Sequence, residues 1–118
     1  MIKLTIPEIP PSLNKYLRMH YQTRKRVNDH WAEIIWHLKL EQRYTESPLK
    51  KSKVTLIYYF PDKKRRDPDN YAGKMIMDGL TRARIIEDDS FDNVILEIKA
   101  KVDKRNPRVE VEIWEVSA

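Results

Sequence analysis

The chain has 118 residues, of which 41% are hydrophobic and 35% charged, and its formal net charge is +5. This composition excludes a disordered tail protein, and the length suits one domain with a single core over residues 1–118. The absence of cysteine excludes disulfides and thiolate zinc sites. A basic chain favours a polyanionic partner. Nucleic acid suits it better than a membrane surface, because the best predicted helix carries charges of both signs.

The first residues, MIKLTIPEIPP, lack the apolar core of a signal peptide, and no apolar run approaches the length that spans a bilayer. We therefore expect a cytoplasmic protein with no membrane segment. Ile2, Leu4 and Ile6 alternate with polar residues and predict a short strand, which the following prolines end.

The next segment, SLNKYLRMHYQTRKR at residues 12–26, interleaves basic and aromatic side chains. Basic groups hold phosphates and aromatic rings stack on unpaired bases. The segment is therefore either a nucleic-acid contact or a solvated loop. Together with two residues of a later basic loop, the candidate nucleic-acid contacts are Asn14, Lys15, Tyr16, Arg18, Arg24, Lys64 and Arg66.

Apolar residues from about Thr23 to Arg43 follow a helical period. One face of this predicted helix holds Val27, Trp31, Ile34, Ile35 and Leu38. Trp36 and Leu40 lie on the opposite face, one turn apart, where the helix of a monomer normally shows only polar groups. We interpret these two residues as a dimer interface, since they make a suitable anchor. Burial of Trp36 in the monomer's own core would contradict this interpretation.

The run VTLIYYF, residues 54–60, is rich in β-branched and aromatic residues and is apolar on both faces, which predicts a central strand. Pro61 ends it. The loop DKKRR, residues 62–66, then brings four consecutive cations against Asp67. Such a run is either a solvated turn or a contact that places Arg66 where a scissile phosphate would lie.

The segment from Arg65 to Asn93 is acidic, against the general trend of the chain. Asp67 before Pro68 is typical of an N-cap followed by proline at the first helical position, so we expect a helix from Asp67. Asp69 then lies in the first turn, where the helix dipole favours anions. Asp88 and Asp89 follow the helix in a loop that can fold back. Carboxylates gathered in this way need a divalent cation; the alternative is a plain cap and a solvated loop.

Asp78 has a simpler explanation, because Lys74, Asp78 and Arg82 are spaced by four and support one another as surface ion pairs. After the acidic loop, residues 94–102 alternate as a half-buried strand, and residues 109–114 alternate after the turn DKRNP, which predicts a hairpin. The expected fold class is α+β, in the order β-α-β-α-β-β, with two helices packed on a mixed sheet.

Residue types exclude several chemistries. The chain has no cysteine nucleophile, no serine in a nucleophile elbow, and only two glycines for a phosphate-binding loop. Clustered carboxylates in a basic protein remain, and metal-assisted phosphodiester hydrolysis requires that combination. Carboxylates hold Mg²⁺, which polarises the phosphate and activates an attacking water.

Four segments resemble the RusA family of Holliday junction resolvases, which are small metal-dependent endonucleases. They are PPSLNKYLR at 10–18, RRDPDN at 65–70, DGLTRA at 78–83 and DDSF from Asp88. The segments cover most of the chain in order and spacing. The resemblance implies that Asp67, Asp69 and Asp89 are the catalytic, metal-binding carboxylates, with Asp88 as the nearest rival of Asp89.

The chain departs from the family pattern at two positions. The family has a catalytic lysine four residues beyond the second aspartate, where this chain has Gly73, and the lysine is Lys74. One residue turns a helix by about 100°, so Lys74 takes the family role only if the helix start shifts. Arg84 replaces a glycine that suits a helix C-terminus, so we expect a different path to the Asp88 loop.

The resemblance further implies a homodimer whose two sites nick symmetry-related strands of a four-way junction, with Mg²⁺ as cofactor and Mn²⁺ as substitute. A twofold dimer presents identical sites to a twofold substrate. The family is common in prophages, and a phage recombination role is compatible with that. Two alternatives remain: a non-catalytic nucleic-acid-binding module whose aspartates serve as caps, and a metal nuclease for flaps or forks.

Overall fold

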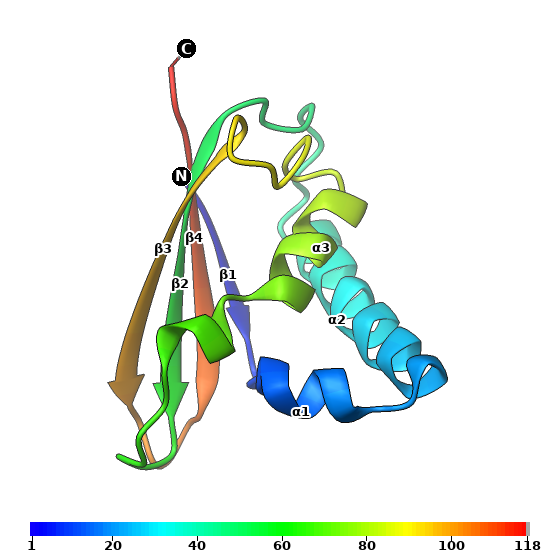
Figure 1. Cartoon of the computed structure of the whole chain (residues 1–118). Helices are drawn as coiled ribbons and strands as arrows, with labels where there is room; N and C mark the ends of the chain where they lie inside the picture. The colour runs from blue at the N-terminus through cyan, green and yellow to red at the C-terminus, as the bar shows by residue number, and fades with distance from the viewer. Residues whose placement is uncertain (118) are drawn as a thin grey trace.

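The fold places three helices on one face of a four-stranded sheet, as the computed structural model in Figure 1 shows for residues 1–117. In chain order the elements are β1 Ile2–Ile6, α1 Leu13–Arg18, α2 Tyr21–Glu41, β2 Ser52–Phe60, the 3₁₀ turn η1 Pro68–Tyr71, α3 Lys74–Arg82, β3 Val94–Val102 and β4 Arg108–Glu115. The α+β class and the predicted order are confirmed. The predicted number of two helices is wrong, because residues 12–26, expected as a nucleic-acid contact or a loop, form the additional helix α1 and the start of α2. No helix in this range is long and apolar enough to cross a membrane.

The sheet has the strand order β1-β4-β2-β3. The predicted central strand is confirmed, because β2 pairs in parallel with β3 on one side and antiparallel with β4 on the other. Leu56 in its middle is opposite both Ile98 and Val111. All the residues of β2 are buried or half-buried, which explains why it shows no polar alternation.

The predicted hairpin of residues 94–102 and 109–114 is wrong. β4 does not pair with β3; it lies between β1 and β2, where the inward side chains Val109, Val111 and Ile113 are fully buried. β3 is an edge strand and mostly exposed, more so than the expected half-buried strand. Its Lys99 and Lys101 suit an edge, since charged side chains protect an edge strand from further pairing. Alternation identified both strands, but it does not specify their neighbours.

The core lies between the sheet and the helices α2 and α3. Trp31 and Ile35 of α2 and Leu80 of α3 are buried against the sheet, as the helical period predicted for α2. A Cβ at Gly79 would come within 2.5 Å of Ile35 Cδ1, so this glycine permits the close approach of α3 to α2. The fixed position of α3 in turn determines where the acidic segments on either side of it lie.

The predicted helix start at Asp67 is also wrong. Asp67 stands at the N-cap position of only the short turn η1, with Pro68 at the first position of that turn, and α3 begins at Lys74. Gly73 separates the two elements with a φ of +79°, a left-handed conformation that side chains disfavour. A Cβ at this position would also collide with the side chain of Leu56. As a result, Asp69 and Lys74 belong to separate elements.

Candidate active site

The turn η1 presents two carboxylates to solvent. Asp67 and Asp69 are both exposed. Asp67 makes no side-chain capping bond; its Oδ1 accepts a hydrogen bond from Arg65 Nε at 3.3 Å. The backbone of the turn closes through Asn70 N, which donates to Asp67 O at 3.0 Å. Both carboxylates therefore keep oxygen atoms that are available to a ligand.

An aromatic cluster supports η1 from below. The ring of Tyr71 meets the rings of Tyr58 and Phe60 edge-on, with centroids 5.6 and 5.1 Å apart. Arg66 stacks over the Phe60 ring of this cluster, with its guanidinium carbon 4.2 Å from the Phe60 centroid. The composition of the run VTLIYYF predicted a strand. The sequence did not show that the aromatic residues of this strand would support the acidic turn.

A second tie joins η1 to the N-terminal segment. Asn70 Oδ1 accepts a hydrogen bond from Asn14 N at 2.8 Å, so the first turn of α1 is attached to η1. The N-terminal basic segment and the acidic turn are therefore neighbours, although 56 residues separate the two bonded positions in sequence. This hydrogen bond places Asn14 and Lys15 beside the candidate catalytic carboxylates.

The second acidic set, Asp88 and Asp89, lies in the loop after α3. Arg84 adopts a φ of +58°, the left-handed conformation that a glycine would take at the end of a helix. Leu49 N then donates to Ile85 O at 3.0 Å and holds the loop to the segment before β2. Asp88 Oδ1 accepts from Asp89 N at 2.9 Å, and both side chains are exposed.

The two acidic sets lie far apart in one chain. Asp67 and Pro68 line a cavity with Ala100, near the carboxyl end of β3. The Asp88 loop lies at the opposite end, just before Val94 (Figure 1). The six residue steps from Val94 to Ala100 span about 20 Å of strand. Among residues 1–117 no three Asp, Glu or His side chains gather closely enough to hold a metal ion. The loop does not fold back onto η1.

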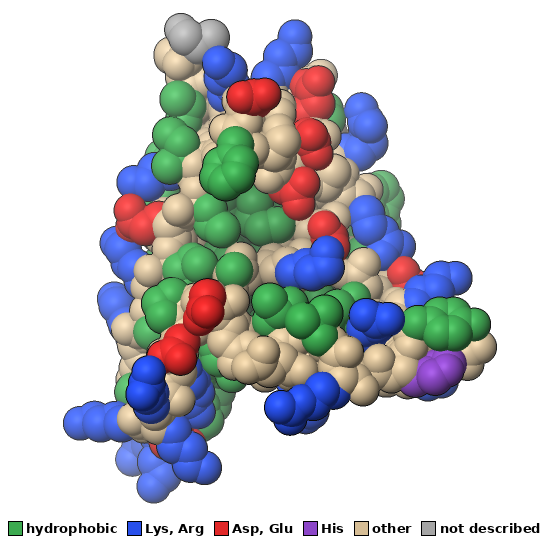
Figure 2. Space-filling view, viewed as in Figure 1, with side chains coloured by type: hydrophobic (Ala, Val, Ile, Leu, Met, Phe, Trp, Pro, Cys, Tyr) green, Lys and Arg blue, Asp and Glu red, His purple; other side chains and the backbone are tan. Residues whose placement is uncertain are grey.

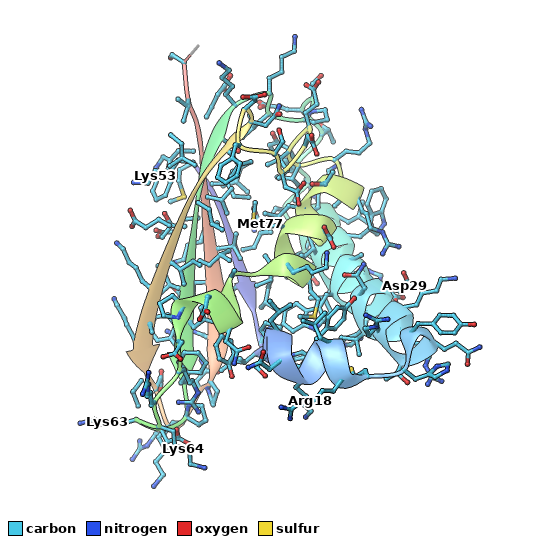
Figure 3. All side chains as sticks on the ribbon, viewed as in Figure 1. Arg18, Asp29, Lys53, Lys63, Lys64 and Met77 are labelled. Atoms are coloured by element: carbon cyan, nitrogen blue, oxygen red, sulfur yellow. The ribbon has the colours of Figure 1, made fainter. Side chains whose placement is uncertain are left out.

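Lys74 begins α3 and points to Asp78, with Nζ 3.5 Å from Oδ2. This predicted ion pair is confirmed, but Arg82 does not extend it. Arg82 Nη1 instead donates to Asp29 Oδ1 of α2 at 2.9 Å, since the packing of α3 on α2 brings a nearer carboxylate. Figure 3 shows Asp29 on the outer side of α2.

The candidate nucleic-acid contacts differ in their exposure. Lys15, Arg18 and Lys64 are exposed, whereas Arg24 is half-buried. Tyr16 is only 7% exposed and belongs to the core, so its ring has no free face for a base. Tyr21, in the same segment, is 63% exposed, and its ring lies 4.7 Å from that of His20.

Arg66 is engaged within the protein. Its Nη2 lies 2.9 Å from Asp62 Oδ1, and its Nη1 donates to the carbonyl oxygens of Asp62 and Lys64. With its stacking over Phe60, these interactions use most of the guanidinium. Arg66 therefore shapes the loop before η1, in addition to any interaction with a phosphate.

Trp36 and Leu40 are exposed by 45% and 53% on the outer face of α2. Trp36 is not buried in the core, which was the finding that would have contradicted a role in dimerisation. It borders an open groove of about 360 Å³ between α2 and α3, which is also lined by Asp29 and Arg82. The dimer interface stays a prediction.

Comparison with protein families gave a match over most of the chain. Residues 8–114 match the family model described as endodeoxyribonuclease RusA. A comparison with curated proteins found no match. The matched range contains α1, the basic loop, η1, the Asp88 loop and nearly all of β4, so it includes both acidic sets. Because the match spans almost the whole chain, this protein belongs to the RusA family of endodeoxyribonucleases.

Proposed function

We propose that this chain is a single-domain, Mg²⁺-dependent endonuclease that resolves four-way DNA junctions by paired nicks, in the cytoplasm, during recombination and repair. One observation carries the proposal: in a member of an endodeoxyribonuclease family, η1 holds Asp67 and Asp69 exposed on a rigid aromatic base. A carboxylate that only caps a helix would use its oxygens in the cap, and Asp67 does not.

The proposed metal ligands are Asp67, Asp69 and Asp89, with Asp88 as the rival of Asp89. Carboxylate oxygens are the ligands that Mg²⁺ prefers, and Mn²⁺ accepts the same set. A bound ion supplies a Lewis acid for the phosphate and lowers the pKa of a water. One chain offers these ligands as two separate sets, so it does not form the complete site by itself.

The proposed homodimer provides a way to complete the site. Leu96 and Val102 of β3 are exposed, and their register with Val54 and Phe60 places them on the helix-bearing face of the sheet. This apolar edge lies between the two acidic sets. A twofold axis across it would bring Asp67 and Asp69 of one copy toward Asp89 of the other. Trp36 and Leu40, exposed on α2, form the other proposed dimer interface.

Lys74 is the proposed catalytic lysine, within reach of a phosphate that meets η1. It begins α3 directly after Gly73, and its only ion pair among residues 1–117 is the exposed one with Asp78. Such exposed pairs contribute little to stability, about 0.3–0.5 kcal/mol. The ammonium group can therefore leave Asp78 for a phosphate at small cost.

The test compares nicking of an end-labelled, immobile four-way junction with nicking of a linear duplex of the same sequence, in Mg²⁺, Mn²⁺ or EDTA. We expect paired cuts in the junction alone, only with metal. Asp69→Asn should abolish cleavage and leave junction binding intact. Asp29→Asn is the matched control, because it removes an equal charge from a carboxylate of α2 that pairs with Arg82 and with no proposed site residue, and it should cleave normally.

Normal cleavage by Asp69→Asn would show that the site is wrong. Junction binding without cleavage in either metal would identify a non-catalytic nucleic-acid-binding module. Metal-dependent cleavage of flaps or forks in preference to the junction would keep the site and change the substrate, because junction choice depends on the spacing of two sites across a dimer.

A further inference from the structure

Two basic loops lie side by side at the carboxyl ends of β2 and β3. Residues 61–66 follow β2 and residues 103–107 follow β3. Because β2 and β3 are parallel neighbours, both loops leave the same end of the sheet, and Asp103 N donates to Phe60 O at 2.8 Å. Figure 3 shows Lys63 and Lys64 at this tip, pointing away from the sheet.

The first loop is folded by an aspartate and an arginine. Asp62 Oδ1 accepts from Lys64 N at 3.0 Å and lies 2.9 Å from Arg66 Nη2. Arg66 in turn stacks over Phe60 at 4.2 Å. The hydrogen bond from the Lys64 backbone, with help from Arg66, holds the pKa of Asp62 below its usual range, so this carboxylate keeps its charge.

The second loop repeats the arrangement. Asp103 Oδ1 accepts from the backbone nitrogens of Arg105 and Asn106, each at 3.2 Å, and Oδ2 accepts from Arg108 Nη1 at 2.8 Å. Arg108 stacks over Tyr59 at 3.7 Å, on the other face of the sheet from Arg66. The Arg108 hydrogen bond lowers the pKa of Asp103. Each loop therefore has, at its first or second residue, an aspartate that is paired to an arginine covering an aromatic ring of β2.

These pairs leave a surplus of positive charge at the tip. Asp62 is paired with Arg66. Arg108 is shared between Asp103 and Glu110, and Lys3 pairs with Glu110 as well, so these charges also balance. Lys63, Lys64, Lys104 and Arg105 are exposed, and their side chains make no ion pair or hydrogen bond among residues 1–117. Figure 2 shows Lys and Arg side chains clustered at this end of the sheet. We call these four residues the basic tip.

We infer that the basic tip binds the phosphate backbone of a DNA duplex arm beside the Asp67–Asp69 turn. The inference rests on the proposed function for its substrate class. The geometry favours phosphates over bases, because Arg66 and Arg108 cover the rings of Phe60 and Tyr59 and leave no free face there for stacking. Lysine and arginine on ordered loops hold phosphates at fixed positions without reading sequence.

The test measures binding of a linear duplex in EDTA, by fluorescence anisotropy, as a function of salt concentration. Two double variants, Lys104→Gln with Arg105→Gln and Lys63→Gln with Lys64→Gln, remove the charges of one loop each. The matched control is Lys50→Gln with Lys51→Gln, an equal charge change in two exposed residues just before β2, at the opposite end of the sheet. Thermal unfolding confirms that each variant is folded.

Each phosphate that a variant no longer neutralises should reduce the slope of log K against log salt by about 0.9. We expect the slope of each tip variant to fall by about 1.8, the control to keep the wild-type slope, and Lys104→Arg with Arg105→Lys to restore it. Equal reductions in the tip variants and the control would overturn the inference, because they would show only the effect of net charge. Unchanged DNA binding with weakened binding to phosphatidylserine vesicles would also overturn it, in favour of a membrane-binding surface.

The measurement is independent of cleavage. A wild-type protein that cleaves no junction but shows the slope changes would contradict the proposed function and leave the basic tip as a duplex-binding surface. A protein that cleaves junctions while the tip variants keep the wild-type slope would contradict the tip alone.

Discussion

Asp67 and Asp89 lie at opposite ends of the edge strand β3. Asp67 shares a cavity lining with Lys99 and Ala100, whereas Asp89 stands in the loop that leads into Val94. The strand between them presents exposed apolar side chains on the face that carries the helices. Because the strand separates the two carboxylates, a complete metal site depends on how two subunits are arranged. A mixing experiment tests this dependence.

Two inactive variants should complement each other if one copy supplies Asp69 and the other supplies Asp89. In a mixture of Asp69→Asn and Asp89→Asn, random exchange makes about half of the dimers mixed, and one of the two sites in each is complete. We expect about one quarter of the wild-type nicking rate, with single nicks in place of paired ones. Gel analysis of an end-labelled junction measures both quantities.

The control mixture combines Asp67→Asn with Asp69→Asn, which alter the same acidic set. No site is complete in any of its dimers, so activity should stay absent. Failure of the first mixture, after subunit exchange has been verified, would contradict a site shared between subunits. The carboxylates of one chain would then have to come together by a rearrangement within that chain.

The sequence predicted the element order and the central strand, because burial on both faces of β2 removes polar residues from it. It did not predict the neighbours of β4, since the alternation of Val109, Val111 and Ile113 is the same beside β3 as between β1 and β2. It also missed the break at Gly73. That glycine was a visible helix-breaking residue, but the collision with Leu56 that requires it depends on tertiary packing.

The acidic residues were recognisable as candidates, and the structure shows them exposed, but their role as metal ligands stays a prediction. Their distribution was not recognisable, because sequence spacing places Asp69 and Asp89 on either side of one helix without fixing the direction of the loop. Tyr16 illustrates the same limit. Basic neighbours suggested a stacking ring, whereas its helical position turns it into the core.

Gly73→Ala should destabilise the fold by about 2–4 kcal/mol, which combines the cost of a left-handed side-chain residue with overpacking against Leu56. Gly79→Ala is the comparison. Its Cβ meets the flexible end of Ile35, and alanine favours the helix by about 1 kcal/mol, so the net destabilisation should be smaller. Urea unfolding measures both. Equal destabilisation by the two changes would show that the conformation of Gly73 has no special role.

Tyr58 should make the fold sensitive to alkaline pH. Its hydroxyl is buried with no hydrogen-bond partner among residues 1–117, and burial raises its pKa far above the ordinary value of 10.0. The unfolded chain therefore loses this proton first, and the contribution to stability falls as pH rises above about 10. Tyr58→Phe should lose that part of the dependence. At neutral pH the Tyr58→Phe variant should be as stable as the wild type or more stable by about 1 kcal/mol, because the variant has no unpaired buried hydroxyl.

The pH dependence is measured by urea unfolding between about pH 8 and pH 11 for both proteins, a range that brackets the ordinary tyrosine pKa. Tyr21→Phe is the matched control, since Tyr21 is exposed and its removal should leave the alkaline slope unchanged. A wild-type slope retained in Tyr58→Phe would assign the alkaline loss of stability to other groups.

Arg84→Gly should stabilise the protein by about 0.5–1 kcal/mol, because Arg84 holds a φ of +58° at the end of α3 and glycine adopts this conformation without strain. Arg43, with a φ of 54° after α2, should behave in the same way, and the two gains should add because the sites are independent. Arg82→Gly is the control: Arg82 is helical, so glycine there should cost about 1 kcal/mol, and it also removes the hydrogen bond to Asp29.

Since Arg84 has no side-chain hydrogen bond or ion pair with the acidic sets among residues 1–117, junction cleavage by Arg84→Gly should match the wild type. Altered cleavage with unchanged stability would instead show that the arginine, rather than the path of its backbone, acts on the Asp88 loop.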